Sequence, residues 1–283
     1  MKLQSVVCYN CNSDGHDFYA EENGFTLVRC RGCGLLYINP RPTDEGIKFD
    51  VMAGLHHGER NFRMAGSFSN GLVQKYIGIL NDIYGNELRR RDKIKWLDIG
   101  SGNGEFLRAL HLWKGFSADL IQGLEPNKAK REFARSENLN IVAAESDLDE
   151  KQFDLISLLN VYSHLPNPIE ALMRWRKLLK SDGELFLETG DSAHLPSQDH
   201  HKPFYLPDHL SFASEKIVLE ILNKVGFKVI SVKKYRHPSF PEPNTRTVAR
   251  AAIGWVREGG KPFANLFPKY PDRDMWIRAR RLC

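Results

Sequence analysis

The 283-residue chain has no apolar run that approaches the roughly 18 residues of a membrane-spanning helix. It opens without the basic and apolar segments of a secretory signal. Its five cysteines are too few for a disulfide framework in a chain of this length. We therefore expect a cytoplasmic protein in which thiols stay reduced and paired cysteines bind metal. The chain also lacks internal repeats and low-complexity tracts, which excludes collagen-like and disordered classes.

The composition is that of an ordinary globular protein, with 42% hydrophobic and 27% charged residues. Its formal net charge of +5 permits an anionic partner such as RNA but does not require one. The length suits one full α/β domain together with a small module.

Four of the cysteines form two Cys-x2-Cys pairs near the N-terminus. Cys8 and Cys11 are followed, after 18 intervening residues, by Cys30 and Cys33. Each pair places two thiolates on one side of a turn, and two pairs complete a tetrahedron around Zn²⁺. We predict a structural zinc site with four protein ligands in a zinc ribbon over residues 1–42. Four reduced cysteines without metal are the alternative.

Helix-like and strand-like segments alternate after this module, which favours a parallel sheet covered by helices. Residues 43–92 carry helical stretches that we assign to a lid or linker, and 93–283 form the main domain. The strand-like segments are Lys93–Ile99, Ala118–Leu124, Asn140–Ala144, Phe153–Leu159, Glu184–Thr189, Lys228–Lys233 and Asp274–Arg280. The helical segments are 68–84, Glu105–Trp113, Lys128–Asn138, Ile169–Lys180, Ser214–Val225 and 246–257.

A glycine-rich turn joins the first strand of the main domain to a helix. It reads Asp98-Ile-Gly100-Ser-Gly102-Asn-Gly104, with GxGxG spacing instead of the GxGxxG of dinucleotide-binding folds. No Gly-Lys-Ser/Thr follows, so it is not a Walker loop. Glu125, at the end of the next strand, offers a carboxylate to the two ribose hydroxyls of a nucleoside. The pattern predicts a nucleoside-containing cofactor; a turn that is only structural is the alternative.

The turn, Glu125 and the segments that follow resemble class I S-adenosylmethionine-dependent methyltransferases over roughly residues 93–235. Phe153-Asp-Leu-Ile-Ser-Leu-Leu-Asn160 is similar to that family's fourth strand, and Leu178-Leu-Lys-Ser-Asp-Gly183-Glu to the approach to its fifth. The resemblance implies an α/β fold with a Rossmann-like seven-stranded sheet that binds S-adenosylmethionine. The residues that it assigns to the cofactor are Asp98, Gly100, Gly102, Gly104, Glu125, Asp147, Leu148 and Asn160.

Four shorter segments resemble one bacterial subgroup of that family, whose members carry an N-terminal zinc ribbon. They are Cys33-Gly-Leu-Leu-Tyr-Ile-Asn-Pro, His164-Leu-Pro-Asn-Pro168, Asp208-His-Leu-Ser-Phe212 and Gly226-Phe. This resemblance implies a sugar or another small hydroxylated metabolite as the methyl acceptor.

A hydroxyl acceptor needs a base, and histidine serves near neutral pH. His209 is the first candidate, His164 the second, and the resemblance adds Tyr205 as a helper. The alternatives are that His209 caps or packs the next helix and that His164 is a structural turn residue. We expect insertions at 190–210 and 237–272 to form the lid and substrate pocket.

Two pairs of adjacent histidines, His56-His57 and His200-His201, suggest a second metal at first sight. Adjacent histidines rarely chelate one ion together, so we assign both pairs to surface loops.

The leading functional hypothesis is methyl transfer from S-adenosylmethionine to a hydroxyl of a sugar or related small metabolite, with a histidine as general base. A second hypothesis is an RNA methyltransferase whose ribbon grips RNA, motivated by the net charge, the ribbon and Arg89-Arg-Arg91. A third is a cofactor-bound module without catalysis.

Overall fold

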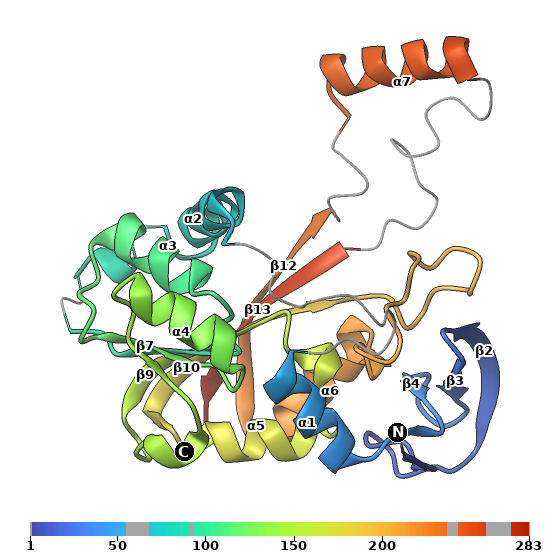
Figure 1. Ribbon diagram of the computed structural model, residues 1–283, viewed down its shortest axis with the longest axis horizontal. Helices are drawn as coiled ribbons and strands as arrows, with labels where there is room; N and C mark the ends of the chain where they lie inside the picture. The colour runs from blue at the N-terminus through green and yellow to red at the C-terminus, as the bar shows by residue number, and fades with distance from the viewer. Residues whose placement is uncertain are drawn as a thin grey trace.

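The computed structural model describes residues 2–54, 68–85, 87–90, 93–236, 243–258 and 273–282. In these ranges the chain forms a seven-stranded sheet with helices on both faces and a four-stranded sheet near the N-terminus (Figure 1). A further pair of short strands, β1 (Leu3–Gln4) and β5 (Arg41–Pro42), closes the N-terminal module.

The large sheet has the strand order β12-β13-β10-β9-β6-β7-β8. The five strands from β10 to β8 run parallel, whereas β13 is antiparallel to both of its neighbours. The predicted α/β class and seven strands are confirmed, and the sheet is mixed instead of wholly parallel. The strands are β6 (Trp96–Ile99), β7 (Ile121–Leu124), β8 (Ile141–Val142), β9 (Phe153–Leu159), β10 (Leu179–Gly190), β12 (Phe227–Arg236) and β13 (Arg273–Arg281).

Alternate residues of the central strands enter two separate apolar clusters, one on each face of the sheet. In β6, Trp96 belongs to one cluster and Leu97 to the other, and Leu155 and Ile156 of β9 divide in the same way. This follows from the two-residue period of a strand. It explains why the strands read as continuous apolar runs, because both faces are buried.

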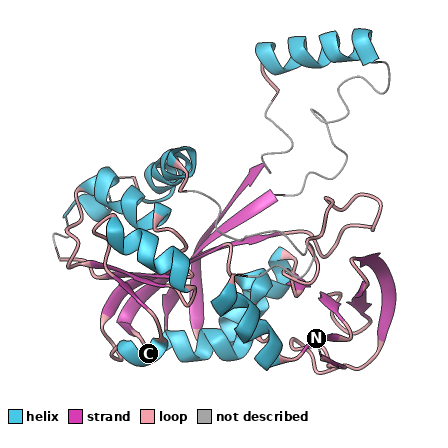
Figure 2. Cartoon of the chain, viewed as in Figure 1, coloured by secondary structure: helices cyan, strands magenta, loops and turns pink. Residues whose placement is uncertain are grey.

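Helices α2 (Asn70–Tyr84), α3 (Glu105–Lys114) and α4 (Lys128–Ser136) cover one face of the sheet. The other face is covered by α5 (Pro168–Arg176) and α6 (Glu215–Lys224) (Figure 2). A polar residue begins each of several helices, since Ser69, Asn127, Asn167 and Ser214 accept a backbone N–H through their side chains. The remaining helices are α1 (Asp44–Ala53) and α7 (Thr245–Glu258).

The N-terminal sheet contains β2 (His16–Glu22), β3 (Phe25–Cys30) and β4 (Leu36–Ile38). Its fourth strand is β11 (Ser211–Phe212), which comes from the loop that follows β10 and pairs with β4. The ribbon and the main domain therefore share a sheet.

One predicted helix end was wrong, and one predicted histidine pair falls outside the described residues. Helix α5 ends at Arg176 instead of Lys180, because Leu179 already pairs with Phe153 in the large sheet. His56 and His57 lie outside the described residues.

The lid roles of 43–92 and 237–272 stay predictions, although α2, inside the first segment, packs into the core. None of the described helices is both long and apolar enough to cross a membrane.

Candidate cofactor and acceptor site

The glycine turn after β6 has positive φ at Gly100, Gly102 and Gly104, with values of +73°, +56° and +92°. A Cβ on Gly100 would lie 2.5 Å from Val161 Cγ2, and one on Gly104 would lie 2.2 Å from Leu139 Cδ1. At Gly102 the nearest atom would be 3.9 Å away. At the two outer positions a Cβ would force a neighbouring side chain to shift, whereas the middle of the turn is open to a ligand.

Glu125 follows β7 and points back at this turn. Its Oε2 accepts the backbone N–H of Gly102 at 2.8 Å, and its Oε1 accepts that of Asn127 at 2.8 Å. Burial raises the pKa of this carboxyl, against the opposing effect of the backbone donors. Each carboxylate oxygen has a second lone pair, so Glu125 can also accept ribose hydroxyls.

Asp98, in β6, is 3% exposed and accepts a hydrogen bond from Ser157 Oγ at 2.6 Å. Burial raises the pKa of Asp98 to about 8, and the charge of Glu125 adds to this rise. Glu188 of β10 is also buried, and burial raises its pKa to about 7 although Lys75 lies 3.7 Å away. Buried carboxyls of this kind favour a cation beside them, which would stabilise their charged form.

The other predicted cofactor residues follow the next two strands of the sheet. Asp147 lies in the turn Glu145–Asp147 after β8, where its Oδ2 accepts the backbone N–H of Ala144 at 3.2 Å. Leu148 is half-buried against the main core, and Asn160 directly follows β9 with φ of +57°. All three belong to the carboxyl-terminal edge of the sheet, the usual ligand edge of such folds.

The rings of the predicted catalytic residues His164 and Tyr205 both lie close to the ring of His209. The ring centroids of His164 and His209 are 4.8 Å apart, and those of Tyr205 and His209 are 5.9 Å apart. The Nδ1 atom of His209 lies 2.9 Å from the carbonyl oxygen of Phe204, and that of His164 lies 2.8 Å from the carbonyl oxygen of Asp208. A neutral His209 that donates from Nδ1 has Nε2 as a proton acceptor. Burial lowers the pKa of His209, which favours this neutral form.

Two of the structural alternatives for histidines can now be judged. His209 does not cap α6, because Ser214 occupies that position. The assignment of His200 to a surface loop is wrong, since this residue is 6% exposed and its ring lies 4.9 Å from that of Phe204 and 5.0 Å from that of Phe212. The ribbon covers the part of the loop that carries it.

The segment after β9 connects the glycine turn to the histidines. Val161 packs beside Gly100, and the carbonyl of Ser163 accepts the backbone N–H of Leu210 at 2.7 Å. The cofactor turn and the paired histidines therefore adjoin one segment, residues 160–164.

The four predicted metal ligands form one cluster in the ribbon. The sulfur atoms of Cys8, Cys11, Cys30 and Cys33 all lie within 4.8 Å of one another, and the closest pairs are 3.4 and 3.5 Å apart. Tetrahedral Zn–S bonds of about 2.3 Å place sulfur atoms about 3.8 Å apart. The cluster therefore has the size of a four-thiolate zinc site.

A protein-family model described as a methyltransferase domain matches residues 75–232, more than half of the chain. The tRNA U34 carboxymethyltransferase of Pseudoalteromonas translucida (strain TAC 125) is 30% identical over 157 residues, which cover 48% of this chain and 45% of that protein. The ubiquinone biosynthesis O-methyltransferase of Glaesserella parasuis serovar 5 (strain SH0165) is 30% identical over 105 residues, which cover 34% of this chain and 44% of that protein. The matches thus span less than half the length of both relatives.

The solved structure of an S-adenosylmethionine-dependent methyltransferase from Archaeoglobus fulgidus is similar to the chain, with a TM-score of 0.51 and 20% identity. The likeness covers 74% of this chain and 94% of that one. It concerns the fold alone.

Proposed function

Because the chain belongs to the class I S-adenosylmethionine-dependent methyltransferases, we propose that it methylates a hydroxyl of a small molecule with His209 as general base. The observation that carries this proposal is the cluster of His164, Tyr205 and His209 beside the segment that contacts the glycine turn. The same segment adjoins both halves of the site, as methyl transfer between two bound molecules requires.

The residues at the strand ends fit the cofactor. Glu125 would hold the ribose, the open face at Gly102 would admit the amino-acid end, and the buried Asp98 would complement positive charge. Asn160 would also contact the cofactor, from the end of β9. Asp147 and Leu148 would contact the adenine from the end of β8. When bound, S-adenosylmethionine supplies a methyl group made electrophilic by its sulfonium sulfur.

His209 would take the proton that the acceptor hydroxyl loses. Its lowered pKa keeps the ring neutral, and its Nε2 atom would accept the proton. The carbonyl of Phe204 would then stabilise the charged ring through the Nδ1–H hydrogen bond. Tyr205, whose side chain stands beside the His209 ring, and His164 would position the acceptor and exclude water.

The acceptor class is argued from two sources. One relative is named as an O-methyltransferase of ubiquinone biosynthesis, which favours a hydroxyl on a small molecule. A sugar acceptor is implied by the sequence resemblance alone. A cytoplasmic location stays an expectation from the sequence. We also propose that the cysteine cluster holds a structural Zn²⁺ ion.

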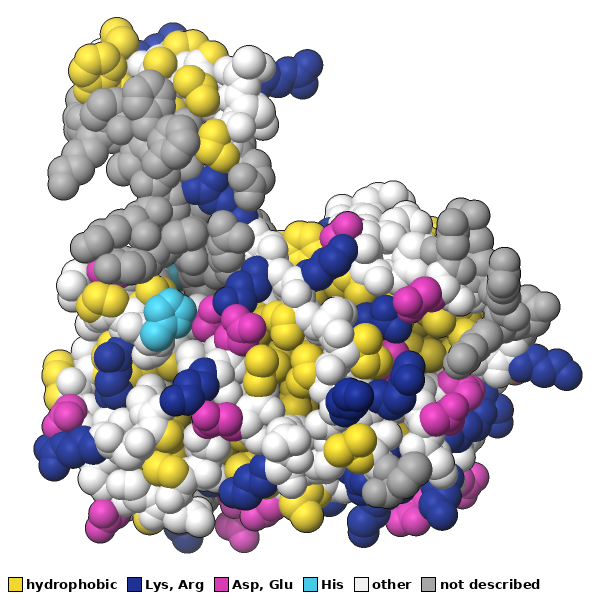
Figure 3. Space-filling view, turned by 180° about the vertical axis from the view of Figure 1, so that it is seen from behind, with side chains coloured by type: hydrophobic (Ala, Val, Ile, Leu, Met, Phe, Trp, Pro, Cys, Tyr) yellow, Lys and Arg dark blue, Asp and Glu magenta, His cyan; other side chains and the backbone are white. Residues whose placement is uncertain are grey.

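An RNA acceptor is the second candidate, favoured by the relative named as a tRNA U34 carboxymethyltransferase. Arg246, Arg250 and Arg257 of α7 are exposed and share one helix face by their spacing. Among the described side chains on the face shown in Figure 3, however, basic and acidic ones are interspersed. A cofactor-binding module without catalysis would leave the paired histidines unexplained.

The test uses purified protein, methyl-labelled S-adenosylmethionine and an extract of cells, separated afterwards into small-molecule, RNA and protein fractions. We expect label in the small-molecule fraction, lost in His209→Asn and retained in His194→Asn, a more exposed histidine of the same loop. Label confined to RNA would overturn the acceptor class. Transfer at the wild-type rate by His209→Asn would overturn the role of the base.

A further inference from the structure

Glu22, at the end of β2 in the ribbon, holds the loop that carries the proposed base. Its Oε2 accepts the backbone N–H of Phe204 at 2.8 Å, and its Oε1 accepts that of Leu206 at 2.9 Å. Between these two amides lies Tyr205, which has φ of +61°, a backbone conformation that residues other than glycine rarely adopt. One carboxylate therefore fixes the backbone on both sides of a strained residue.

The same contact reaches His209 through one residue, Phe204. Phe204 donates its N–H to Glu22 and accepts the Nδ1–H of His209 at its carbonyl. Phe204 and Leu206 are 2% and 0% exposed, so no solvent replaces Glu22 at their amides without a rearrangement. A shift of this backbone would move the carbonyl that sets the orientation of the His209 ring.

We infer that Glu22 is a positioning residue for methyl transfer, which holds His209 and Tyr205 in place from the ribbon. This inference rests on the proposed function of His209 as the base. It gives the ribbon a role in the acceptor site that neither the cysteine pattern nor the relatives assign to it.

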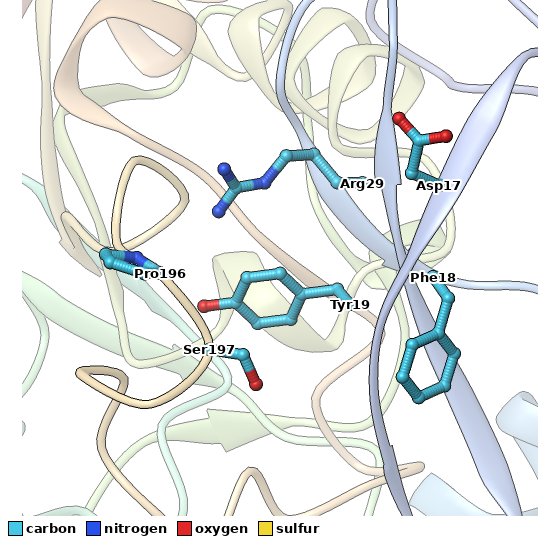
Figure 4. A pocket seen from close by; sticks show the side chains of 6 residues that line it. All are labelled: Asp17, Phe18, Tyr19, Arg29, Pro196 and Ser197. Atoms are coloured by element: carbon cyan, nitrogen blue, oxygen red, sulfur yellow. The ribbon is translucent and has the colours of Figure 1, made fainter.

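A second set of contacts fixes the beginning of the loop to the ribbon. Tyr19 donates its hydroxyl to the carbonyl of Leu195 at 3.0 Å, and Arg29 donates to the same oxygen while its guanidinium lies over the Tyr19 ring. Figure 4 shows both side chains pointing toward Pro196 and Ser197 across a shallow pocket. The ribbon therefore holds the loop at Leu195, near its beginning, as well as at Phe204 and Leu206.

A third set fixes the end of the loop. Strand β11 pairs with β4, and the backbone N–H of Ile38 donates to the carbonyl of Leu210 at 3.0 Å. The hydroxyls of Tyr9 and Ser211 lie 3.1 Å apart. His209 therefore lies two residues before a strand of the ribbon sheet, and five and three residues after the two amides that Glu22 anchors.

The charge of Glu22 affects the pKa of His209, and this effect distinguishes a positioning role from packing alone. Burial, the largest effect, lowers the pKa of His209, and His200 also lowers it, whereas the hydrogen bond with the Phe204 carbonyl and the charge of Glu22 raise it. Tyr205 and His164 are the other titratable side chains whose rings face His209. Removing the charge of Glu22 should therefore lower the pKa of His209 further.

The test compares Glu22→Gln with Glu21→Gln, an exposed neighbour on the same strand. The pKa of His209 is followed by NMR of the imidazole signals, and transfer of label to the small-molecule fraction of a cell extract is measured at saturating S-adenosylmethionine. In Glu22→Gln we expect a lower His209 pKa, a rate about 10- to 100-fold lower and unchanged cofactor affinity. Glu22→Asp, which keeps the charge, should be intermediate.

The two proposals fail in different ways. If Glu22→Gln equals Glu21→Gln in both pKa and rate while His209→Asn abolishes transfer, the positioning role is wrong. If the His209 pKa depends on Glu22 but His209→Asn transfers methyl groups normally, the base assignment is wrong. Should Glu22→Gln unfold, Glu22→Asp tests the positioning alone, because it keeps the charge and shortens the side chain; a rate equal to that of Glu21→Gln would then refute the inference.

Discussion

Binding of S-adenosylmethionine should release a proton from Asp98, so cofactor affinity should rise with pH. The pKa of Asp98 is raised to about 8, which leaves it mostly protonated at neutral pH. A cationic ligand favours the ionised carboxylate. Below the pKa, the ionised fraction increases tenfold per pH unit, so the association constant should increase about tenfold between pH 6 and 7. The α-amino group of the cofactor, with a pKa of about 7.7–8.0, stays protonated in this window.

Calorimetric titration at pH 6.0, 6.5 and 7.0, in two buffers of different ionisation enthalpy, measures the cofactor affinity and the number of protons released on binding. We expect about one proton released per cofactor bound, most of it from Asp98, so Asp98→Asn should remove most of the pH dependence of the affinity. Glu188, with a pKa raised to about 7, adds to the slope, so Glu188→Gln should reduce it without removing it. An affinity that is flat or falls with pH, without proton release, would refute the assignment of Asp98 to the cofactor site.

Three other outcomes are expected. Gly104→Ala should lower the free energy of unfolding by about 2–4 kcal/mol in denaturant titrations, because its φ is unfavourable and its Cβ would meet Leu139; Gly102→Ala, which meets no close atom, should lose clearly less, and equal losses would contradict this reasoning. His209→Asn should slow methyl transfer about 10²- to 10⁴-fold at unchanged cofactor affinity in calorimetry, and a parallel loss of affinity would indicate a structural role instead. Cys8→Ser should lower the zinc content in metal analysis and the melting temperature together; a zinc-loaded, equally stable variant would exclude Cys8 as a ligand.

Much of the fold could be predicted because its determinants are local. The strands of the large sheet are short apolar segments that end at glycine or polar residues, and the Cys-x2-Cys pairs have a spacing specific to metal sites. The glycine turn was recognisable for the same reason, since its positive φ angles favour glycine at three alternate positions of one short segment. The zinc ion and the roles of the site residues stay predictions.

The contacts between the ribbon and the loop could not be predicted. Strand β11 has two residues, too few for a periodic signal, and its partner β4 lies far away in the sequence. Glu22 reads as an ordinary polar residue at a strand end, and its partners are 182 and 184 residues away. The burial of His200 was missed for the same reason, because the ribbon that covers it is remote in sequence.

The pairing of β4 with β11 also sets an order of events during synthesis. Ile38 leaves the ribosome long before Leu210, its hydrogen-bond partner, and at 5–20 residues per second the interval is about 10–35 s. The four cysteines of the ribbon are made before this interval begins, so capture of the proposed zinc ion can precede completion of the sheet. During the wait, β4 is an unpaired edge that can join another chain. A chaperone, or early metal binding at the proposed zinc site, would therefore protect the nascent N-terminal segment.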